Sequence, residues 1–324
     1  MNSTKAASPE IQRKPTTMQS ETTKTFLAGG IAGCCAKTVV APFDRIKILL
    51  QAHNNHYKHL GVFSTLKSVI VKEGVVGLFQ GNGVQMIRVF PYAAIQFLSY
   101  EKFKKLAKIH FHDHLQAGKL LSGSLAGMCA VLCTYPLDVI RARLAFQVKG
   151  ELIYSGLIDV VKSIFHIEGK MAFFKGIQPT LLGMVPYAGL SFYSFESLKE
   201  ACLEYFPEYL GKPCPQNTGG VVLIVPAKVV CGGLAGAFAQ TVSYPLDVVR
   251  RKMQVSRMLP ESHKYDVGWY RILCIVYKED GIVKGLFRGM SVNYIRAMPM
   301  VATSFTVYEL VKQWLGLDTG VDNS

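Results

Sequence analysis

The chain of 324 residues is basic and apolar, with a formal net charge of +14 at pH 7 and 50% hydrophobic residues. This charge admits nucleic acid, anionic lipid or an anionic solute as a partner. We exclude nucleic acid, because the basic residues are spread among apolar segments and form no basic run interleaved with aromatics. The eight cysteines form no CxxC pair, so we expect reduced cysteines that serve as small packing residues.

Residues 1–24 are polar, rich in Ser and Thr, and lack the apolar core of a secretory signal. Glu10 and Glu21 also make this segment a poor amphipathic presequence. We therefore expect a disordered N-terminal tail at 1–24.

The rest of the chain repeats one unit three times. Its clearest marker is Pro-x-Asp-x-x-Lys/Arg, which begins at Pro42, Pro136 and Pro245, at intervals of 94 and 109 residues. A unit that recurs at such intervals predicts three copies of one structural element in a single body. We place the three units at 25–114, 115–214 and 215–318, followed by a C-terminal tail at 319–324.

Each unit contains two segments that are long and apolar enough to span a bilayer, which needs about 20 residues. The six segments are Phe26–Leu50, Val84–Phe103, Leu120–Leu144, Ile177–Leu198, Val229–Val249 and Val292–Val311. The first segment of each pair carries a GxxxG motif that begins at Gly29, Gly123 or Gly232 and ends nine residues before the proline. Glycines four residues apart share a helix face and predict close approach of a neighbouring backbone.

Between the two spans of each unit lies an amphipathic stretch, near Phe63–Lys72, Leu157–His166 and Trp269–Lys278. Apolar residues at helical spacing beside Lys and Arg predict a short helix on the membrane surface. Each stretch is followed by an acidic residue and Gly, and then by an aromatic residue, one further residue and Gly. The predicted fold class is thus an all-α membrane protein with six transmembrane helices in three pseudo-threefold repeats, each with a short surface helix.

This tripartite pattern resembles the mitochondrial carrier family from about Phe26 to Leu315. Departures are Leu49 in place of a basic residue, Gln80 in place of another, and Ala145 where the other units have Gln51 and Gln254. Stretches such as Ala28–Lys37 and Thr134–Gly150 are similar to the subgroup associated with coenzyme A transport. The resemblance implies a monomer in the mitochondrial inner membrane, with both termini in the intermembrane space, a short helix per repeat on the matrix side, and cardiolipin as a lipid partner.

Ionisable residues follow the repeated prolines, and such residues in membrane helices usually face the bundle interior. Local pairs three residues apart, each worth about 0.3 to 0.5 kcal/mol, are one arrangement. The resemblance implies another, a matrix gate in which each acid meets a base on the next helix: Asp44 with Arg141, Asp138 with Arg250, and Asp247 with Lys47. It also implies that Gln51 and Gln254 brace the gate and that Pro42, Pro136 and Pro245 bend the helices. We call these six charged residues the matrix ring.

The second span of each unit ends in an aromatic residue followed by Glu-x-x-Lys. The residues are Tyr100, Glu101 and Lys104, then Phe195, Glu196 and Lys199, then Tyr308, Glu309 and Lys312. The resemblance implies a cytoplasmic gate, whereas Glu and Lys at a helix end can also simply extend to the interface. We call the three Glu and three Lys residues the outer ring. Two rings that cannot both be closed around one cavity would give alternating access.

Positions that differ between the units should identify the solute. Lys37 lies seven residues before Asp44, about 10 Å along a helix, and Arg88 lies 13 residues before Glu101, about 20 Å. Arg88, Gly183 and Arg296 occupy equivalent positions. Three cations at one depth predict a multiply anionic solute, because Arg can bind phosphate through two hydrogen bonds.

Gly183, Met184 and Tyr187 would give the cavity a flat apolar face. The resemblance associates Gly and an aliphatic residue here with adenine, while helix packing is the alternative for Met184 and Tyr187. We therefore expect Lys37, Arg88, Gly183, Met184, Tyr187 and Arg296 to bind coenzyme A or a related adenine nucleotide, and we expect transport by exchange. An ATP/ADP or ATP/phosphate carrier is the nearest alternative.

Other classes of protein have less support. A carrier-like scaffold that has lost transport should have eroded gates or an apolar cavity, and a membrane enzyme acting on acyl-coenzyme A would need a general base in the cavity. Two histidine clusters, His53, His56 and His59, and His110, His112 and His114 with Asp113, fall in loops and lack a closed ligand set. We expect neither a catalytic residue, nor a metal, nor a cofactor.

Overall fold

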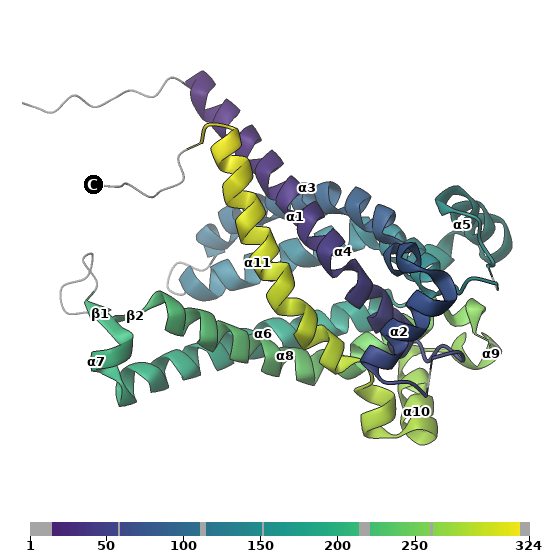
Figure 1. Ribbon diagram of the computed structural model, residues 1–324. Coiled ribbons are helices and arrows are strands. Elements are labelled where there is room, and N and C mark those ends of the chain that lie inside the picture. Colours follow the sequence, from purple (N-terminus) through teal and green to yellow (C-terminus); the bar gives the residue numbers. More distant parts are fainter. Residues whose placement is uncertain are drawn as a thin grey trace, which may run out of the picture.

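The computed structural model describes residues 15–57, 59–110, 115–150, 152–213, 221–259 and 262–317. Its six long helices are α1 (Pro15–Gln51), α3 (Asn82–His110), α4 (Leu115–Phe146), α6 (Ile177–Tyr205), α8 (Val225–Gln254) and α11 (Met290–Trp314). They converge at one end and splay apart at the other, where α1 begins and α11 ends (Figure 1). Each contains one expected span, so the predicted all-α membrane fold of three repeats is confirmed.

The bundle is closed by contacts between consecutive units. The second helix of each unit packs against the first helix of the next: α3 against α4, α6 against α8, and α11 against α1. A hydrogen bond from Lys24 Nζ to the Leu315 carbonyl, 3.2 Å long, joins the two ends of the described chain. We call the end of the bundle where α1 begins and α11 ends the terminal end.

Short helices cover the opposite end, which we call the short-helix end (Figure 1). They are α2 (Val62–Glu73), α5 (Leu157–Ser163) with its continuation η2 (Ile164–Glu168), and α10 (Trp269–Asp280), all within the predicted stretches or within two residues of them. Single turns η1 (Val75–Phe79), η3 (Lys170–Phe174) and η5 (Ile282–Leu286) follow, and η4 (Ser256–Met258) and α9 (Ser262–Tyr265) precede α10. Phe63, Ile158 and Tyr270 are exposed on these helices, as expected for helices that lie on a membrane surface.

The glycines at the start of α3 and α6 are required by the fold. Gly81 and Gly176 have φ angles of +84° and +87°, which favour glycine. A Cβ at Gly81 would lie 3.1 Å from the Arg141 carbonyl, and one at Gly176 would lie 3.0 Å from the Arg250 carbonyl. These glycines therefore let each unit's second helix begin directly against the next unit's first helix.

The GxxxG interpretation was wrong about what the glycines contact. A Cβ at Gly29 or Gly123 would meet no atom within 4 Å, and one at Gly232 would meet only the Phe195 ring, at 4.0 Å. The second glycines of two motifs do meet the neighbouring helix, because a Cβ at Gly33 would lie 3.2 Å from Val89 and one at Gly127 would lie 3.4 Å from Met184, and a Cβ at Gly30 would collide with the ring of Phe90. All of these neighbours are side-chain atoms, so the motif glycines do not sit at a backbone-to-backbone contact.

The N-terminal end of the bundle also differs from expectation. Helix α1 begins at Pro15, so residues 15–24 are helical where we expected a disordered tail, and residues 1–14 lie outside the described range. Extending an existing helix by polar residues costs little, because only nucleation is strongly unfavourable.

At the terminal end, α7 (Pro207–Leu210) leads to two short antiparallel strands, β1 (Gly211–Pro213) and β2 (Val221–Leu223), which the sequence did not predict. Seven of the eight cysteines lie in the described range and all seven are free thiols, whereas Cys214 lies outside it. Cys202 and Cys231, on α6 and α8, have sulfur atoms 3.7 Å apart beneath the strands.

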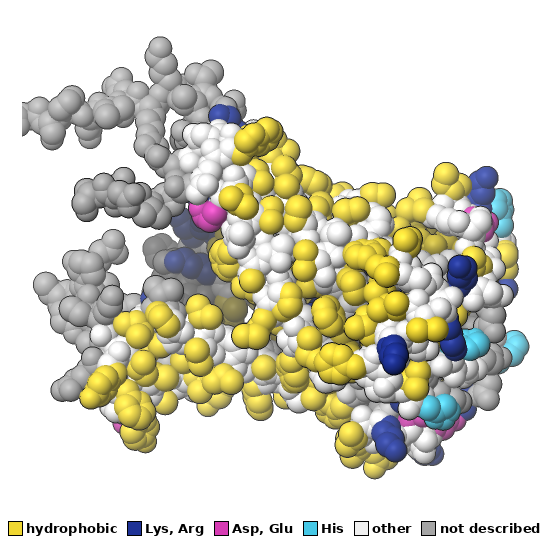
Figure 2. Space-filling view, in the orientation of Figure 1, with side chains coloured by type: hydrophobic (Ala, Val, Ile, Leu, Met, Phe, Trp, Pro, Cys, Tyr) yellow, Lys and Arg dark blue, Asp and Glu magenta, His cyan; other side chains and the backbone are white. Residues whose placement is uncertain are grey.

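Composition alone identifies fewer spans than the six we expected. Of the described helices, three meet a length and hydropathy criterion for a membrane span: Thr23–Gln51 in α1, Gly118–Phe146 in α4 and Pro226–Gln254 in α8. Helices α3 and α6 have 29 residues each and α11 has 25, so they are long enough but less uniformly apolar. Hydrophobic side chains cover the outer face of the long helices, while Lys, Arg and His side chains gather at the short-helix end (Figure 2).

Candidate functional site

The matrix ring is closed in this structure. Arg141 Nη2 donates to Asp44 Oδ2 at 2.6 Å, from α4 to α1, and Arg250 Nη2 donates to Asp138 Oδ2 at 2.6 Å, from α8 to α4. The third pair is looser, with Lys47 Nζ 3.9 Å from Asp247 Oδ2. The structure thus brings the three predicted partners together on neighbouring helices, whereas the three local pairs would have left the helices unconnected.

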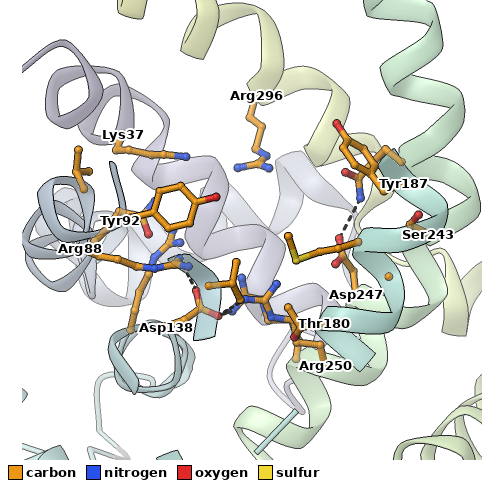
Figure 3. Close-up of a pocket in the computed structure, with 18 of the residues that line it drawn as sticks. Lys37, Arg88, Tyr92, Asp138, Thr180, Tyr187, Ser243, Asp247, Arg250 and Arg296 are labelled. Carbon is orange, nitrogen blue, oxygen red and sulfur yellow. Dashed lines mark hydrogen bonds and ion pairs between the residues drawn. The ribbon is translucent and has the colours of Figure 1, made fainter. Parts of the chain in front are cut away.

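Two of the ring carboxylates are shared with cations from the cavity. Arg88 Nη1 on α3 lies 3.1 Å from Asp138 Oδ1, and Arg296 Nη1 on α11 lies 2.7 Å from Asp44 Oδ1. The other oxygen, Oδ2, accepts the hydrogen bond from the ring partner in both carboxylates. The third carboxylate, Asp247, instead accepts a hydrogen bond from Gln240 Nε2 at 3.0 Å. Each ring acid therefore has a partner in the ring and at least one more on the cavity side, and Figure 3 shows this arrangement at Asp138 and the Asp247 contact.

Of the two predicted braces, Gln254 contacts the ring. Its Nε2 donates to Asp138 Oδ2 at 2.8 Å and lies 3.2 Å from the Tyr135 hydroxyl. Gln51 is fully buried beside Tyr244, but both of its amide atoms lack a partner that meets hydrogen-bond geometry in the described structure. The helices continue through Pro42, Pro136 and Pro245, and their bending stays a prediction.

A second layer of ion pairs lies on the short-helix side of the ring and connects the long helices to the short ones. Arg143 forms a two-point contact with Glu168, and Lys252 Nζ lies 3.6 Å from Asp280. Both bases lie seven residues after their prolines, where the first unit has Leu49. There Arg45, one turn earlier, takes over the role, with its Nη2 2.7 Å from Glu73. Burial raises the pKa of Glu168, but the hydrogen bonds and charge of Arg143 outweigh it and hold that pKa below its usual range.

The same layer joins the third unit to the first. His53 Nε2 lies 3.2 Å from the Lys284 carbonyl and 3.5 Å from Asp280 Oδ2. Burial, with the positive charge of Lys252, lowers the pKa of His53 to about 4, so the imidazole is neutral near pH 7. Nearby, burial and the Glu73 carboxylate raise the pKa of Tyr57 to about 12.

Above the ring lies a cavity of about 570 Å³ that contains all six predicted substrate-binding residues in its wall: Lys37, Arg88, Gly183, Met184, Tyr187 and Arg296. Six cationic and two acidic side chains line it in total. Lys37, Arg88 and Arg296 extend into the same space from α1, α3 and α11 (Figure 3). Because the cations outnumber the acids and converge, the cavity is suited to a multiply anionic ligand.

Helix α6 presents an apolar face to the same cavity. Tyr187 is 40% exposed, so its ring is open to the cavity. Met184 has a packing role as well, because its methyl group would lie 3.4 Å from a Cβ at Gly127 and its side chain packs on the core of the second unit. At Gly183 the cavity gains the space that an arginine fills at the equivalent positions.

The outer ring is open. Glu101 with Lys104, at 4.0 Å, and Glu196 with Lys199, at 2.6 Å, pair within their own helices, three residues apart. Lys104 and Lys312 also lie over the rings of Tyr100 and Tyr308, and among the described residues no ion pair joins outer-ring residues of different helices. With one ring closed and the other open, the cavity faces the terminal end. The role of the outer ring as a gate stays a prediction.

Sequence reasoning missed several members of the site. Arg251 lines the cavity and lies 3.4 Å from Asp138, Asn293 accepts hydrogen bonds from Lys47 and Arg296, and Tyr92 stacks on the guanidinium of Arg88. Arg251 could have been found, because it is a base where the other units have Ile48 and Ala142.

The described residues contain no group of three or more His, Cys, Asp or Glu side chains that could hold a metal, and residues 111–114 of the second histidine cluster lie outside them.

Comparison with known proteins agrees with this architecture. The sequence profile of the family described as mitochondrial carrier protein matches residues 18–111, 114–206 and 223–319. Solute carrier family 25 member 16 of Bos taurus is 54% identical over 298 residues, which cover 91% of this chain and 89% of the relative. Mitochondrial carrier protein CoAc1 of Arabidopsis thaliana is 41% identical, with 90% and 89% covered, and mitochondrial carrier protein LEU5 of Saccharomyces cerevisiae is 37% identical, with 90% of each covered.

Proposed function

The chain belongs to the mitochondrial carrier family, and we propose that it transports coenzyme A or a related adenine nucleotide. Members of this family are transporters of the mitochondrial inner membrane, not enzymes, and carry small anionic solutes. The substrate is the part that we propose. The observation that carries the proposal is the convergence of Lys37, Arg88 and Arg296 on one cavity that the apolar face of Gly183 and Tyr187 also lines.

The shared arginines suggest how such a solute would open the gate. A phosphate that binds Arg88 and Arg296 competes with Asp138 and Asp44 for the same guanidinium groups. Each carboxylate then keeps only its ring partner, so the closed matrix ring loses part of its stabilisation when the cavity is occupied. Coupling of this kind requires that the ligand interact differently with the two states, which the sharing of the arginines provides.

The open outer ring completes the cycle. Its six charges are unpaired between helices while the matrix ring is closed, so they are available to pair when the matrix ring opens. We infer that the state described here is open toward the intermembrane space, with both termini on that side and the short helices in the matrix. The shared location of the two chain ends, opposite the short helices, supports this orientation.

Uptake into proteoliposomes tests the proposal. Labelled coenzyme A, ADP and adenosine 3′,5′-diphosphate would be offered to wild type, to Arg88→Ala, and to the control Lys67→Ala, which removes an exposed cation of α2 outside the cavity. We expect Arg88→Ala to reduce uptake at least about tenfold, the loss typical of a charge-assisted hydrogen bond of about 1.5 to 3 kcal/mol, and the control to match wild type. Equal uptake by wild type and Arg88→Ala would contradict the proposal.

The same panel separates the alternatives. An ATP/ADP or ATP/phosphate carrier would take up ADP and leave coenzyme A outside. A scaffold without transport activity would take up none of the three. Cardiolipin as a lipid partner and the monomeric state remain part of the proposal, and the dependence of uptake on cardiolipin in the vesicles is the measurement for the first.

A further inference from the structure

A second cavity adjoins the cationic one. It has a volume of about 320 Å³, lies between α3 and α4, and is lined by Ala93, Gln96, Phe97, Tyr100, Gly123 and Ala126. Ala93 lines both cavities, so the second continues from the first along α3 toward the terminal end. We call it the α3–α4 recess.

The recess differs from the cationic cavity in its chemistry. Each of its six lining residues is uncharged, whereas eight charged side chains line the neighbouring cavity. Gln96 supplies an amide that can both donate and accept a hydrogen bond, and Tyr100 supplies a hydroxyl. Carbon atoms of Phe97, Ala93 and Ala126 make up much of the remaining wall. Such a wall suits an uncharged ligand group that combines amides with apolar segments.

The recess begins at a defined distance from the cations. Gln96 lies eight residues after Arg88 and Tyr100 lies twelve after it, which correspond to about 12 and 18 Å along a helix. A solute whose phosphates bind at Arg88 therefore reaches the recess only if it has an arm of that length. Adenine nucleotides without such an arm would leave the recess empty.

Gly123 provides the room in this recess. A Cβ at this position would meet no atom within 4 Å, so the glycine is not needed for helix packing. Gly29, at the equivalent position of the first unit, is equally free of neighbours. A side chain at Gly123 would project into space that the structure leaves unfilled, and would compete with any group bound there.

We propose that the α3–α4 recess binds the uncharged pantetheine arm of coenzyme A while Lys37, Arg88 and Arg296 hold its phosphates. This inference rests on the proposed function and deepens it, because it assigns the discrimination between coenzyme A and shorter adenine nucleotides to particular residues. Gln96 and Tyr100 would bind the amides of the arm, and Gly123 would leave space for it.

The test compares coenzyme A with adenosine 3′,5′-diphosphate, which shares its adenosine and 3′-phosphate but lacks the pantetheine arm and one of the two 5′-phosphates. Uptake of coenzyme A and of adenosine 3′,5′-diphosphate would be measured in proteoliposomes for wild type, Gly123→Leu and the matched control Gly29→Leu. Filling a site by a bulky side chain should reduce coenzyme A uptake by Gly123→Leu at least about tenfold, with a change below about twofold for the short nucleotide. We expect Gly29→Leu to transport both solutes as wild type does.

A second variant tests the polar contact of the recess without adding side-chain volume. Gln96→Met preserves the length of the side chain and removes its amide, and it should raise the KM for coenzyme A severalfold while leaving that for the short nucleotide unchanged. Thermal unfolding in detergent checks that each variant is folded before uptake is measured.

Several results would overturn the inference. They are equal loss of both solutes in Gly123→Leu, undiminished coenzyme A uptake in both variants, or the same selective loss in Gly29→Leu. A wild type that takes up only the short nucleotide also overturns it, while leaving an adenine nucleotide carrier standing. A wild type that takes up neither solute would instead refute the proposed function.

Discussion

The two charged rings of this protein have similar sequence patterns and opposite structures. At the short-helix end, Asp44 and Asp138 are buried, and their basic partners on other helices, less than one fifth exposed, bind them at 2.6 Å. At the terminal end, Glu196 and Lys199 form a pair within one helix, each about one third exposed. An acid and a base three residues apart thus become a gate or a local surface pair according to whether a neighbouring helix is close enough to offer a better partner. Burial decides the energetic difference, because exposed pairs contribute about 0 to 1 kcal/mol, whereas breaking a buried one costs about 3 to 5 kcal/mol.

Asp138→Asn should have the largest effect. Asp138 contacts Arg88, Arg250, Arg251 and Gln254, so removing its charge leaves three arginines without this carboxylate. We expect a loss of about 3 to 5 kcal/mol in the free energy of unfolding and at least about tenfold lower uptake. Thermal unfolding and proteoliposome uptake measure the two effects, with Glu204→Gln, an exposed acid of α6, as the control. A stable, active Asp138→Asn would mean that the ring is not what holds the short-helix end closed.

Arg45→Met should have the next largest effect on stability. Arg45 is 1% exposed, and its guanidinium also donates to the carbonyls of Ala145 at 3.2 Å and Gln147 at 2.8 Å, so it joins the first unit to the second. Its loss leaves the buried Glu73 without its base, at a cost of about 3 kcal/mol measured by unfolding.

The double variant Arg45→Met/Leu49→Arg refines this prediction. It moves the guanidinium to the position that Arg143 and Lys252 occupy in the other units. We expect it to recover part of the lost stability, since the position seven residues after the proline reaches the corresponding acid in both of those units. No recovery would show that the first unit has adapted its packing to Arg45 alone.

Lowering the pH should reduce the free energy of unfolding through protonation of His53 at the short-helix end. Its pKa is about 4 in the folded chain and ordinarily 6.5, so between these values the unfolded chain binds the proton more strongly. The free energy of unfolding should therefore fall as the pH is lowered from 6.5 toward 4, by at most about 3 kcal/mol. His53→Asn should remove this part of the pH dependence while tolerating the φ angle of +54° at this position. An unchanged profile in the variant would exclude His53 as the cause.

Glu196→Gln should have the smallest effect on stability. Its carboxylate is paired only with Lys199 in this state, and both side chains are partly exposed. We expect the free energy of unfolding to change by less than about 1 kcal/mol, whereas uptake should change more if the outer ring closes in the other state, as we propose. Equal, small effects on both measurements would favour the simpler interpretation of a Glu and Lys that extend to the interface.

The sequence by itself determined the repeat, the helices and the identity of the ring residues. Threefold recurrence of Pro-x-Asp-x-x-Lys/Arg identified the ring residues, whose pairing between helices the family resemblance implied, and the asymmetry between Arg88, Gly183 and Arg296 located the cationic cavity. Both follow from periodicity, which fixes the face and depth of a side chain along one helix.

Only the tertiary structure decided which ring is closed, that Arg88 and Arg296 share the gate carboxylates, and that Arg45 replaces the missing base at Leu49. It also showed that Gly123 borders a recess and not a helix contact. These features depend on the spacing between helices far apart in the chain. Helical periodicity places each residue on its own helix, but the distance to the next helix is set by the packing of all the side chains between them.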